Sequence, residues 1–384
     1  MTNLRLEDFL GQENRATAAW SRFGLLENPF PSRSHPVWDV FHNQVQVVQR
    51  FYADLGEFVR EGKTTTLFFT GGNRVGKTHF CEHHRLTLPG AFAKAGLMVP
   101  MAVVSAESCR FSELYRPIID QLQESLRLQT GHGFFPESWR QVLQAALDSL
   151  RPGDFREAVK VYLQSSQDQS PVVHSLLMQW LRGERLRMPQ RKQLGVGSVI
   201  ESLAHELNAL EGIIEVLRKS DLGEPRRCPG VILFVDEFEL MWTHRRDKRD
   251  RFLQALRALV DACPMGLFMC VAMATGVGYN FEVEDLEGAY PALFARLKGV
   301  RDVPALVEVG GVIEAQEYAQ AFLDSGGKKA RDEGIQAGER LFSESDVRRL
   351  FLEVAGSGGS VSQGDFFDKL HVVAESKVIN PSGQ

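Results

Sequence analysis

Four short runs of apolar residues interrupt a chain whose other apolar residues mostly recur at helical spacing. The runs are "TLFFT" at 66–70, "LMVPMAVVSAES" at 97–108, "VILFV" at 231–235 and "MGLFMCVAMATG" at 265–276. Continuous apolar runs of this length are typical of strands that are buried on both faces, as in a parallel sheet between helices. The pattern therefore predicts an α/β fold with a parallel sheet.

Helical periodicity fills most of the remaining sequence. It predicts helices at about 42–61 and 111–128, and an almost wholly helical stretch at 134–222 between the second and third strands. Three more helical segments follow Gly310, beginning with one at 313–326. Helices that alternate with buried strands are the pattern of α/β proteins, so we expect helices on both faces of the sheet.

We expect four regions along the chain. Residues 1–36 are an N-terminal extension with a Pro-rich lead-in, and 377–384 are a flexible tail. Residues 37–310 form the α/β core, with a helical insert at about 129–228, and 311–376 form a helical lid subdomain.

A Gly-rich loop follows the first strand. The sequence "GGNRVGKT" at 71–78 fits the phosphate-loop template G-x-x-x-x-G-K-[ST], and it lies between a strand and a helix as the template requires. Gly71 and Gly76 let the backbone approach a phosphate closely, and the amides that follow point inward at a helix N-terminus. We expect Lys77 to reach the β and γ phosphates of a nucleotide and the Thr78 hydroxyl to bind Mg²⁺. The predicted nucleotide-binding residues are Gly71, Gly72, Asn73, Arg74, Val75, Gly76, Lys77, Thr78 and His79.

An acidic pair follows the third strand, in "VILFVDEFEL" at 231–240. A strand that ends in two acids is common in any core, but beside a phosphate loop it indicates an NTPase. We expect Asp236 to be the carboxylate on the Mg²⁺ side and Glu237 to act as the base that orients the attacking water.

Two further residues are candidates for contact with the γ-phosphate during hydrolysis. Thr275 ends the fourth strand, where its hydroxyl would contact the γ-phosphate or the water, or would only cap the next turn. Arg296 lies in "GAYPALFARLKG" at 288–299, a short predicted helix. It is either a surface charge of its own subunit or an arginine finger that reaches the γ-phosphate of a neighbouring subunit.

Composition limits the class of protein. The 384 residues are 43% hydrophobic and 24% charged, with a net charge of −5, so the chain is globular and able to bury a large core. The five cysteines form no Cys-x-x-Cys pair, which fits a reducing cytoplasm. The start of the sequence is polar, and no apolar run approaches the ~18 residues of a membrane helix, so we expect a cytoplasmic protein without membrane contact.

Two basic segments are candidates for contact with DNA or another subunit. "THRRDKRDR" at 243–251 reads first as a solvated helix face, and "WLRGERLRMPQRKQ" at 180–193 as a basic loop. A pI of about 6.1 argues against a surface coated with nucleic-acid-binding residues, although a local patch is compatible with it.

The arrangement of elements resembles the AAA+ ATPases, which implies a parallel five-stranded sheet with a large helical insert before the Walker B strand and a C-terminal helical lid. "FGLLENPFP" at 23–31 resembles the lead-in of the origin-recognition and STAND branches. "QWLRGE" at 179–184, "VILFVDEFEL" and "YPALFARL" at 290–297 resemble the ATP-binding proteins of BREX-type phage-defence loci. One position departs from the AAA+ pattern: the last lid segment carries Gln363 and no arginine that could sense the γ-phosphate.

The resemblance implies an enzyme, a P-loop ATPase that uses ATP and Mg²⁺ to drive or switch a DNA-directed assembly in anti-phage defence. It implies a homo-oligomer, ring-like in form, that works with double-stranded DNA and other proteins of the same system. One alternative is an ATP-switched DNA-binding adaptor that recruits a transposase or another effector. A secretion-linked ATPase is another, suggested by the Asn-Pro-Phe lead-in.

Overall fold

The computed structural model describes residues 19–32, 36–42, 44–219, 227–275, 290–291, 305–336, 338–356 and 358–379. The chain divides into two compact units. One contains the described parts of Met1–Gln44, Gly71–His83 and Leu306–Gln384, and the other contains those of Val45–Thr70 and His84–Ala305.

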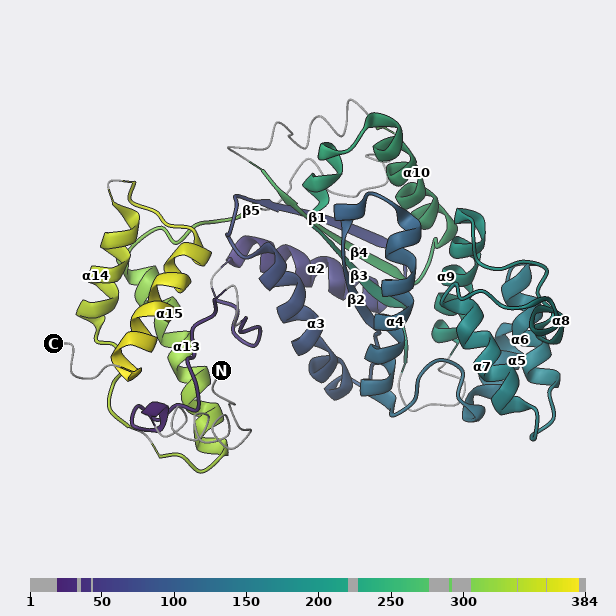
Figure 1. Ribbon diagram of the computed structural model, residues 1–384, viewed down its shortest axis with the longest axis horizontal. Helices are drawn as coiled ribbons and strands as arrows, with labels where there is room; N and C mark the ends of the chain where they lie inside the picture. Colours follow the sequence, from purple (N-terminus) through teal and green to yellow (C-terminus); the bar gives the residue numbers. More distant parts are fainter. Residues whose placement is uncertain are drawn as a thin grey trace, which may run out of the picture. The chain divides into compact units, whose positions relative to one another are not determined.

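Five strands form one sheet with the order β2-β3-β4-β1-β5 (Figure 1). The strands are β1 (Thr65–Gly71), β2 (Met101–Ser105), β3 (Val231–Asp236), β4 (Leu267–Ala274) and β5 (Ala305–Leu306). β3 runs parallel to both β2 and β4, and Ser105 is the register partner of Asp236. The predicted fold class is confirmed, and all four strands expected from the apolar runs are present.

Every residue of β1, β3 and β4 is buried, which is the pattern of a sheet with helices on both faces. On one face lies α2 (Val45–Glu61), whose Phe51 and Phe58 pack edge-on or tilted against Phe268 of β4. Three further helices of this sheet region are α3 (Lys77–Lys94), α4 (Phe111–Thr130) and α10 (Arg246–Ala262).

Strand β2 lies at the edge of the sheet, and α4 satisfies the backbone groups that this edge would otherwise leave open. The Gln121 side chain accepts a hydrogen bond from the amide of Val103 at 2.8 Å and donates one to its carbonyl at 2.7 Å. Gln129 makes the same pair of bonds with Val99, both at 3.0 Å. Covering an edge in this way prevents pairing with the strand of another chain.

Five helices separate β2 and α4 from β3. They are α5 (Arg140–Ala146), α6 (Asp154–Gln164), α7 (Ser170–Leu181), α8 (Met188–Leu194) and α9 (Leu203–Arg218), and they gather beside α4 and α10 in Figure 1. Helix α8 lies in the segment that we expected to be a basic loop, so that part of the prediction was wrong. Across the described part of the chain, no helix is both long and apolar enough to cross a membrane.

The lid consists of α13 (Val312–Asp332), α14 (Glu344–Ala355) and α15 (Gln363–Ile379). The lead-in packs into this group through Phe30, whose ring centre lies 5.6 Å from that of Phe342 and 6.3 Å from that of Phe322. Helix α13 continues past Gly326, where the sequence predicted its end. A Cβ at Gly326 would lie 3.0 Å from side-chain atoms of Leu25 and Pro29, so the glycine there permits packing and does not stop the helix.

Gly212 gives a direct test of core packing within the insert. It lies in α9 and faces the buried Phe155 of α6, and a Cβ at this position would fall 2.1 Å from the Phe155 ring. We expect Gly212→Ala to destabilise the protein by about 1–2 kcal/mol, because the overpacking cost exceeds the gain in helix propensity.

Gly56 of α2 is the matched control, since a Cβ there has no neighbour within 4 Å. Gly56→Ala should stabilise the protein by about 0.5–1 kcal/mol. Chemical denaturation of both variants measures the difference, and a Gly212→Ala protein as stable as Gly56→Ala would contradict the observed packing.

Candidate nucleotide-binding site

Residues 71–78 connect β1 to α3, as the phosphate-loop template requires. Gly71 stands where a side chain has no room, because a Cβ would lie 2.6 Å from Val75 Cγ2 and 3.3 Å from the Leu306 carbonyl oxygen. Gly76 has a φ of +99°, a conformation that side chains rarely adopt. Both template glycines are therefore needed by the backbone geometry of the loop.

Lys77 lies buried inside its own loop. Its Nζ donates hydrogen bonds to the carbonyl oxygens of Gly72 at 2.7 Å and Gly71 at 3.3 Å. A buried ammonium group must be hydrogen-bonded to offset the cost of leaving water. The loop thus holds a buried cation close to its own carbonyl groups, where an anionic phosphate oxygen would be a stronger hydrogen-bond partner than a carbonyl.

The remaining predicted loop residues differ in their surroundings. Thr78 is exposed and lies in the first turn of α3, while Val75 is buried against Gly71. Asn73 is exposed, and the Arg74 side chain turns toward the start of α15.

His79 follows the loop and is enclosed by aromatic rings. Its ring centre lies 5.5 Å from that of Trp38 and 5.8 Å from that of Phe41. Burial, with a smaller contribution from the neighbouring His83, lowers the pKa of His79 to about 4, although a hydrogen bond to the backbone of Val40 opposes this shift. The ring is neutral at pH 7, and its buried Nε2 has no hydrogen-bond partner among the described residues.

The acidic pair lies at the end of β3. Asp236 is buried, and its Oδ1 accepts a hydrogen bond of 2.8 Å from the amide of Glu237. Glu237 has a φ of +55°, in the left-handed region that is unusual for a residue with a side chain. A strained residue of this kind persists only where its surroundings fix it, and such residues cluster at functional sites.

Ser105 holds the Glu237 carboxylate in this position. The Ser105 hydroxyl donates to Glu237 Oε2 at 2.5 Å and accepts a hydrogen bond from the amide of Glu107 at 3.1 Å. No motif in the sequence marks Ser105. Its role becomes visible only from the strand order, which puts the end of β2 in register with the end of β3.

This hydrogen-bond path continues to helix α10. His244 Nε2 lies 2.6 Å from the Glu107 carbonyl oxygen, and Lys248 Nζ lies 3.2 Å from His244 Nδ1. Because a carbonyl only accepts, His244 carries its proton on Nε2 and accepts from Lys248 through Nδ1. Bonds through Glu107 and Ser105 thus connect a basic helix with Glu237.

The end of β4 is joined to the acidic segment by a buried carboxylate. Glu239 Oε2 accepts a hydrogen bond of 2.8 Å from the amide of Ala274, the residue before Thr275. Thr275 is partly exposed and directly follows the strand. Arg296 lies outside the described residues, so its predicted role stays a prediction.

The carboxyl ends of three strands define one edge of the sheet. Thr70, Asp236 and Ala274 are at or next to the ends of β1, β3 and β4, which are neighbours in the parallel sheet. Open α/β sheets bind ligands outside this edge. The acidic pair and the strand that leads into the phosphate loop therefore end where a ligand is expected.

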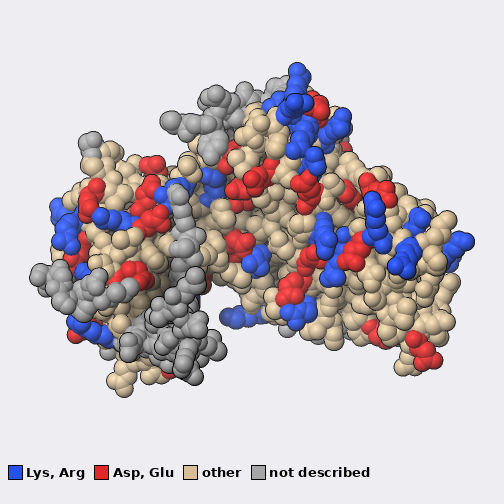
Figure 2. Space-filling view, viewed as in Figure 1, with Lys and Arg blue, Asp and Glu red and all other residues tan. Residues whose placement is uncertain are grey.

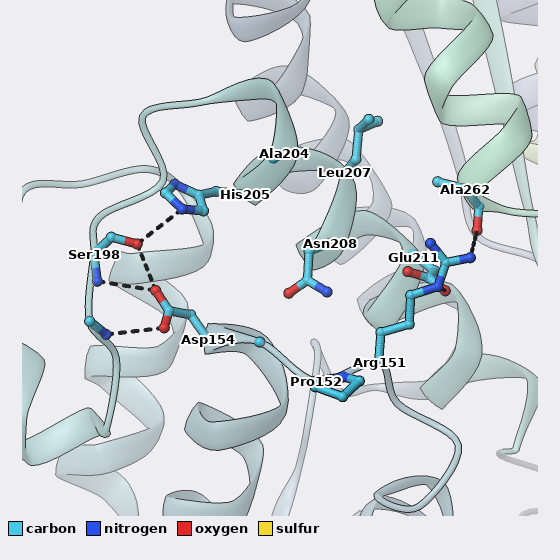
Figure 3. Close-up of a pocket in the computed structure, with 12 residues that line it drawn as sticks. Arg151, Pro152, Asp154, Ser198, Ala204, His205, Leu207, Asn208, Glu211 and Ala262 are labelled. Carbon is cyan, nitrogen blue, oxygen red and sulfur yellow. Dashed lines mark hydrogen bonds and ion pairs between the residues drawn. The ribbon is translucent and has the colours of Figure 1, made fainter.

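A cavity of about 700 Å³ in the helical insert is lined by a Ser, a His and an Asp, among other residues (Figure 3). Asp154 accepts hydrogen bonds from the amides of Gly197 and Ser198, both at 3.1 Å, and from the Ser198 hydroxyl at 2.6 Å. Burial raises the pKa of Asp154, but these hydrogen bonds outweigh it and lower that pKa overall.

This arrangement does not form a nucleophile. The Ser198 hydroxyl donates its hydrogen bond to Asp154, whose lowered pKa makes it a weak base. His205 Nε2, 3.2 Å away, can therefore only donate to the Ser198 oxygen and cannot act as its base. The three residues fasten the loop before α9 to the start of α6, and their role is structural.

The strand order, the phosphate loop and the acidic strand end have the arrangement that the sequence predicted for a P-loop NTPase. Residues 118–307 match the family described as BREX system ATP-binding protein BrxC/D. The matched range contains the acidic pair but not the phosphate loop, and it is just under half of the chain. The resemblance predicted from the sequence is confirmed over this range.

Two solved structures from Aeropyrum pernix are similar to the chain. The ORC2 protein in ADPNP–ADP complexes shares 13% identity, with 90% of this chain and 72% of that chain covered and a TM-score of 0.42. The ORC1 protein in complex with DNA shares 12% identity, with 88% and 67% covered and a TM-score of 0.37. Comparison with curated proteins gives no match.

The lowered pKa of His79 predicts a pH dependence of stability. The pKa is about 4 in the folded protein against an ordinary value of 6.5, so the unfolded chain binds more protons between these values. The stability contributed by the neutral ring is present above pH 6.5 and is lost as the pH falls toward 4, by roughly 3 kcal/mol.

His79→Phe keeps the aromatic packing and removes the titration. The free energy of unfolding, measured from pH 7 to pH 4, should fall less steeply in this variant than in the unsubstituted protein. Identical pH profiles would show that the pKa of His79 is not lowered by folding.

Proposed function

We propose that this protein is a Mg²⁺-dependent ATPase in which the phosphate loop and the β3 acids act on one nucleotide. The observation that carries the proposal is the loop itself, with two glycines at sterically closed positions and the desolvated Lys77 held on its own carbonyls. The description of the matched family as ATP-binding supports the identity of the nucleotide.

Mg²⁺ fits the residues at hand. This ion retains several waters and usually takes one or two protein oxygens together with substrate phosphates. Thr78 would supply the hydroxyl and Asp236 a carboxylate, and both side chains carry the hard oxygen atoms that Mg²⁺ prefers. The ion would neutralise charge on the β and γ phosphates when bound.

Glu237 is proposed as the general base. The hydrogen bond from Ser105 would hold its Oε2, so that the other carboxylate oxygen can accept a proton from the attacking water. Lys77 and the loop amides bind the β and γ phosphates, and Thr275 contacts the γ-phosphate or the water. Arg296 is proposed as an arginine finger from a neighbouring subunit. Recovery of turnover when Arg296→Ala and Lys77→Ala chains are mixed would support this role, and normal turnover by Arg296→Ala alone would exclude it.

Glu237→Gln tests the chemistry of the site. The amide keeps the shape of the side chain but cannot accept a proton, so the variant should bind ATP and hydrolyse it at least ~100-fold more slowly. Turnover is measured by phosphate release, and ATP binding by titration.

Glu107→Gln is the matched control, because this exposed acid lies beside Ser105 but contributes only its backbone to the hydrogen-bond path. It should retain turnover. If Glu237→Gln hydrolyses ATP as fast as this control, Glu237 is not the base.

The cellular role proposed here follows the BREX family resemblance: ATP turnover in anti-phage defence, coupled to DNA and to other proteins of the same system. We propose a cytoplasmic homo-oligomer, since an arginine finger requires a neighbouring subunit.

A basic surface at the start of α10 supports the DNA part of the proposal. Lys and Arg side chains gather over this region in Figure 2, next to acidic ones. A cavity of about 880 Å³ here is lined by Arg110, Arg245, Lys248 and Arg251, and by the acids Glu201, Glu206 and Asp247.

Three of these cations lie in a row that could contact successive phosphates of a nucleic acid. Arg245, Lys248 and Arg251 are three residues apart, so they lie along one side of the helix. Within the described part of the chain none of them forms an ion pair, whereas Arg246 pairs with Asp250 at 3.7 Å. Cations without carboxylate partners are available to phosphates of a nucleic-acid backbone.

Reversing this charge should weaken DNA binding. We expect Lys248→Glu with Arg251→Glu to lower the affinity for double-stranded DNA by about tenfold or more at 0.1 M salt. The slope of the logarithm of affinity against the logarithm of salt concentration should also become about two smaller, because about two phosphate contacts are lost.

Arg257→Glu is the control, because Arg257 lies on the same helix but outside the cavity. Fluorescence anisotropy with labelled duplex measures both variants. Equal affinities for the two would place the DNA contact elsewhere.

A further inference from the structure

Arg74, a residue of the phosphate loop, adopts a strained backbone conformation. Its φ is +61°, in the left-handed region. A residue with a side chain pays roughly 1–2 kcal/mol for this conformation, and glycine would avoid that cost. Strain at a ligand-binding loop points to a role for the side chain.

The Arg74 side chain joins the loop to the lid. Its guanidinium forms ion pairs with Asp365 and Asp368, both in the first turns of α15. Its carbonyl oxygen accepts a hydrogen bond of 2.9 Å from the amide of Gly364. Asp365 also accepts a hydrogen bond of 2.5 Å from the Ser362 hydroxyl.

The start of α15 packs closely on the same loop. A Cβ at Gly364 would lie 2.8 Å from Arg74 Nε, and a Cβ at Gly76 would lie 2.8 Å from Gln363 Oε1. Gln363 is buried and donates a hydrogen bond of 2.7 Å to the Tyr318 hydroxyl of α13. The first turn of α15 is therefore tied both to the phosphate loop and to the rest of the lid.

The charges at this contact are opposite to what a phosphate site requires. Two carboxylates lie beside a loop whose amides and lysine are arranged for an anion, and they would repel the terminal phosphate of ATP. Arg74 compensates these carboxylates in the structure described here. It lies three residues before Lys77, and its side chain is long enough to reach a phosphate bound in the loop.

We propose that Arg74 is the residue that couples the nucleotide to the lid: its guanidinium is shared between Asp365 and Asp368 without nucleotide, and moves to the terminal phosphate when ATP binds. ATP then loosens the first turn of α15 from the loop. The inference rests on the proposed function, since it requires ATP in the phosphate loop. Arg74 would then supply the cation that contacts the terminal phosphate, because the last lid segment carries Gln363 and no arginine.

Removing the charges of Asp365 and Asp368, or that of Arg74, should change the ATP affinity in opposite directions. Asp365→Asn with Asp368→Asn removes the repulsion and frees Arg74, so ATP affinity should rise about fivefold or more. Arg74→Ala leaves the carboxylates uncompensated, so affinity should fall by a similar factor or more. Adding the two asparagine substitutions to Arg74→Ala should restore part of the loss.

Glu353→Gln is the matched control. It removes an ion pair within the lid, Glu353 with Lys369, which does not involve the phosphate loop. This variant should bind ATP like the unsubstituted protein. If the double asparagine variant binds ATP no more tightly than Glu353→Gln, the carboxylates do not compete for Arg74 and the proposal is wrong.

Hydrogen exchange of the unsubstituted protein gives a second readout that needs no variant. Mg·ATP should speed exchange at the first amides of α15, residues 363–368, while the middle of α15 stays protected. Slower exchange at 363–368 with ATP would overturn the proposal. Failure of the unsubstituted protein to bind ATP at all would instead refute the proposed function, and so the two failures are distinguishable.

Discussion

The site depends on one close approach of the backbone at the end of β1. Every residue of this strand is buried, and the chain must turn at once into the phosphate loop. Gly71 makes the turn possible, because a Cβ would lie only 2.6 Å from Val75 Cγ2 and in tight contact with Leu306. The position of the loop amides and of Lys77 follows from this turn, and so does the start of α3.

Strain in the backbone marks both halves of the proposed site. Arg74 in the loop and Glu237 after β3 have side chains and yet adopt left-handed conformations. Each is held by a partner from another segment, Arg74 by carboxylates of α15 and Glu237 by the Ser105 hydroxyl. Partners of this kind fix the side-chain direction, which catalysis and ligand exchange both require.

Buried strands and the phosphate loop were predictable because a local pattern encodes them, as in the runs at 66–70 and 231–235. The contacts of Ser105 and Arg74 were not, since they depend on which strand ends and helices become neighbours. Local signals also misled where packing decides: Gly326 looked like a helix end, and the segment of α8 looked like a loop because its residues are mostly polar. Arg296 and the domain boundaries remain predictions.

The central claim is that the phosphate loop and the β3 acids serve one Mg·ATP. Hydrogen exchange with and without Mg·ATP tests it most directly, since ligand contact slows exchange of the amides that it covers. The account predicts that protection rises together at 72–79 and at 236–240, with the same dependence on ATP concentration. Protection of only one of these segments, or of neither at saturating Mg·ATP, would contradict it.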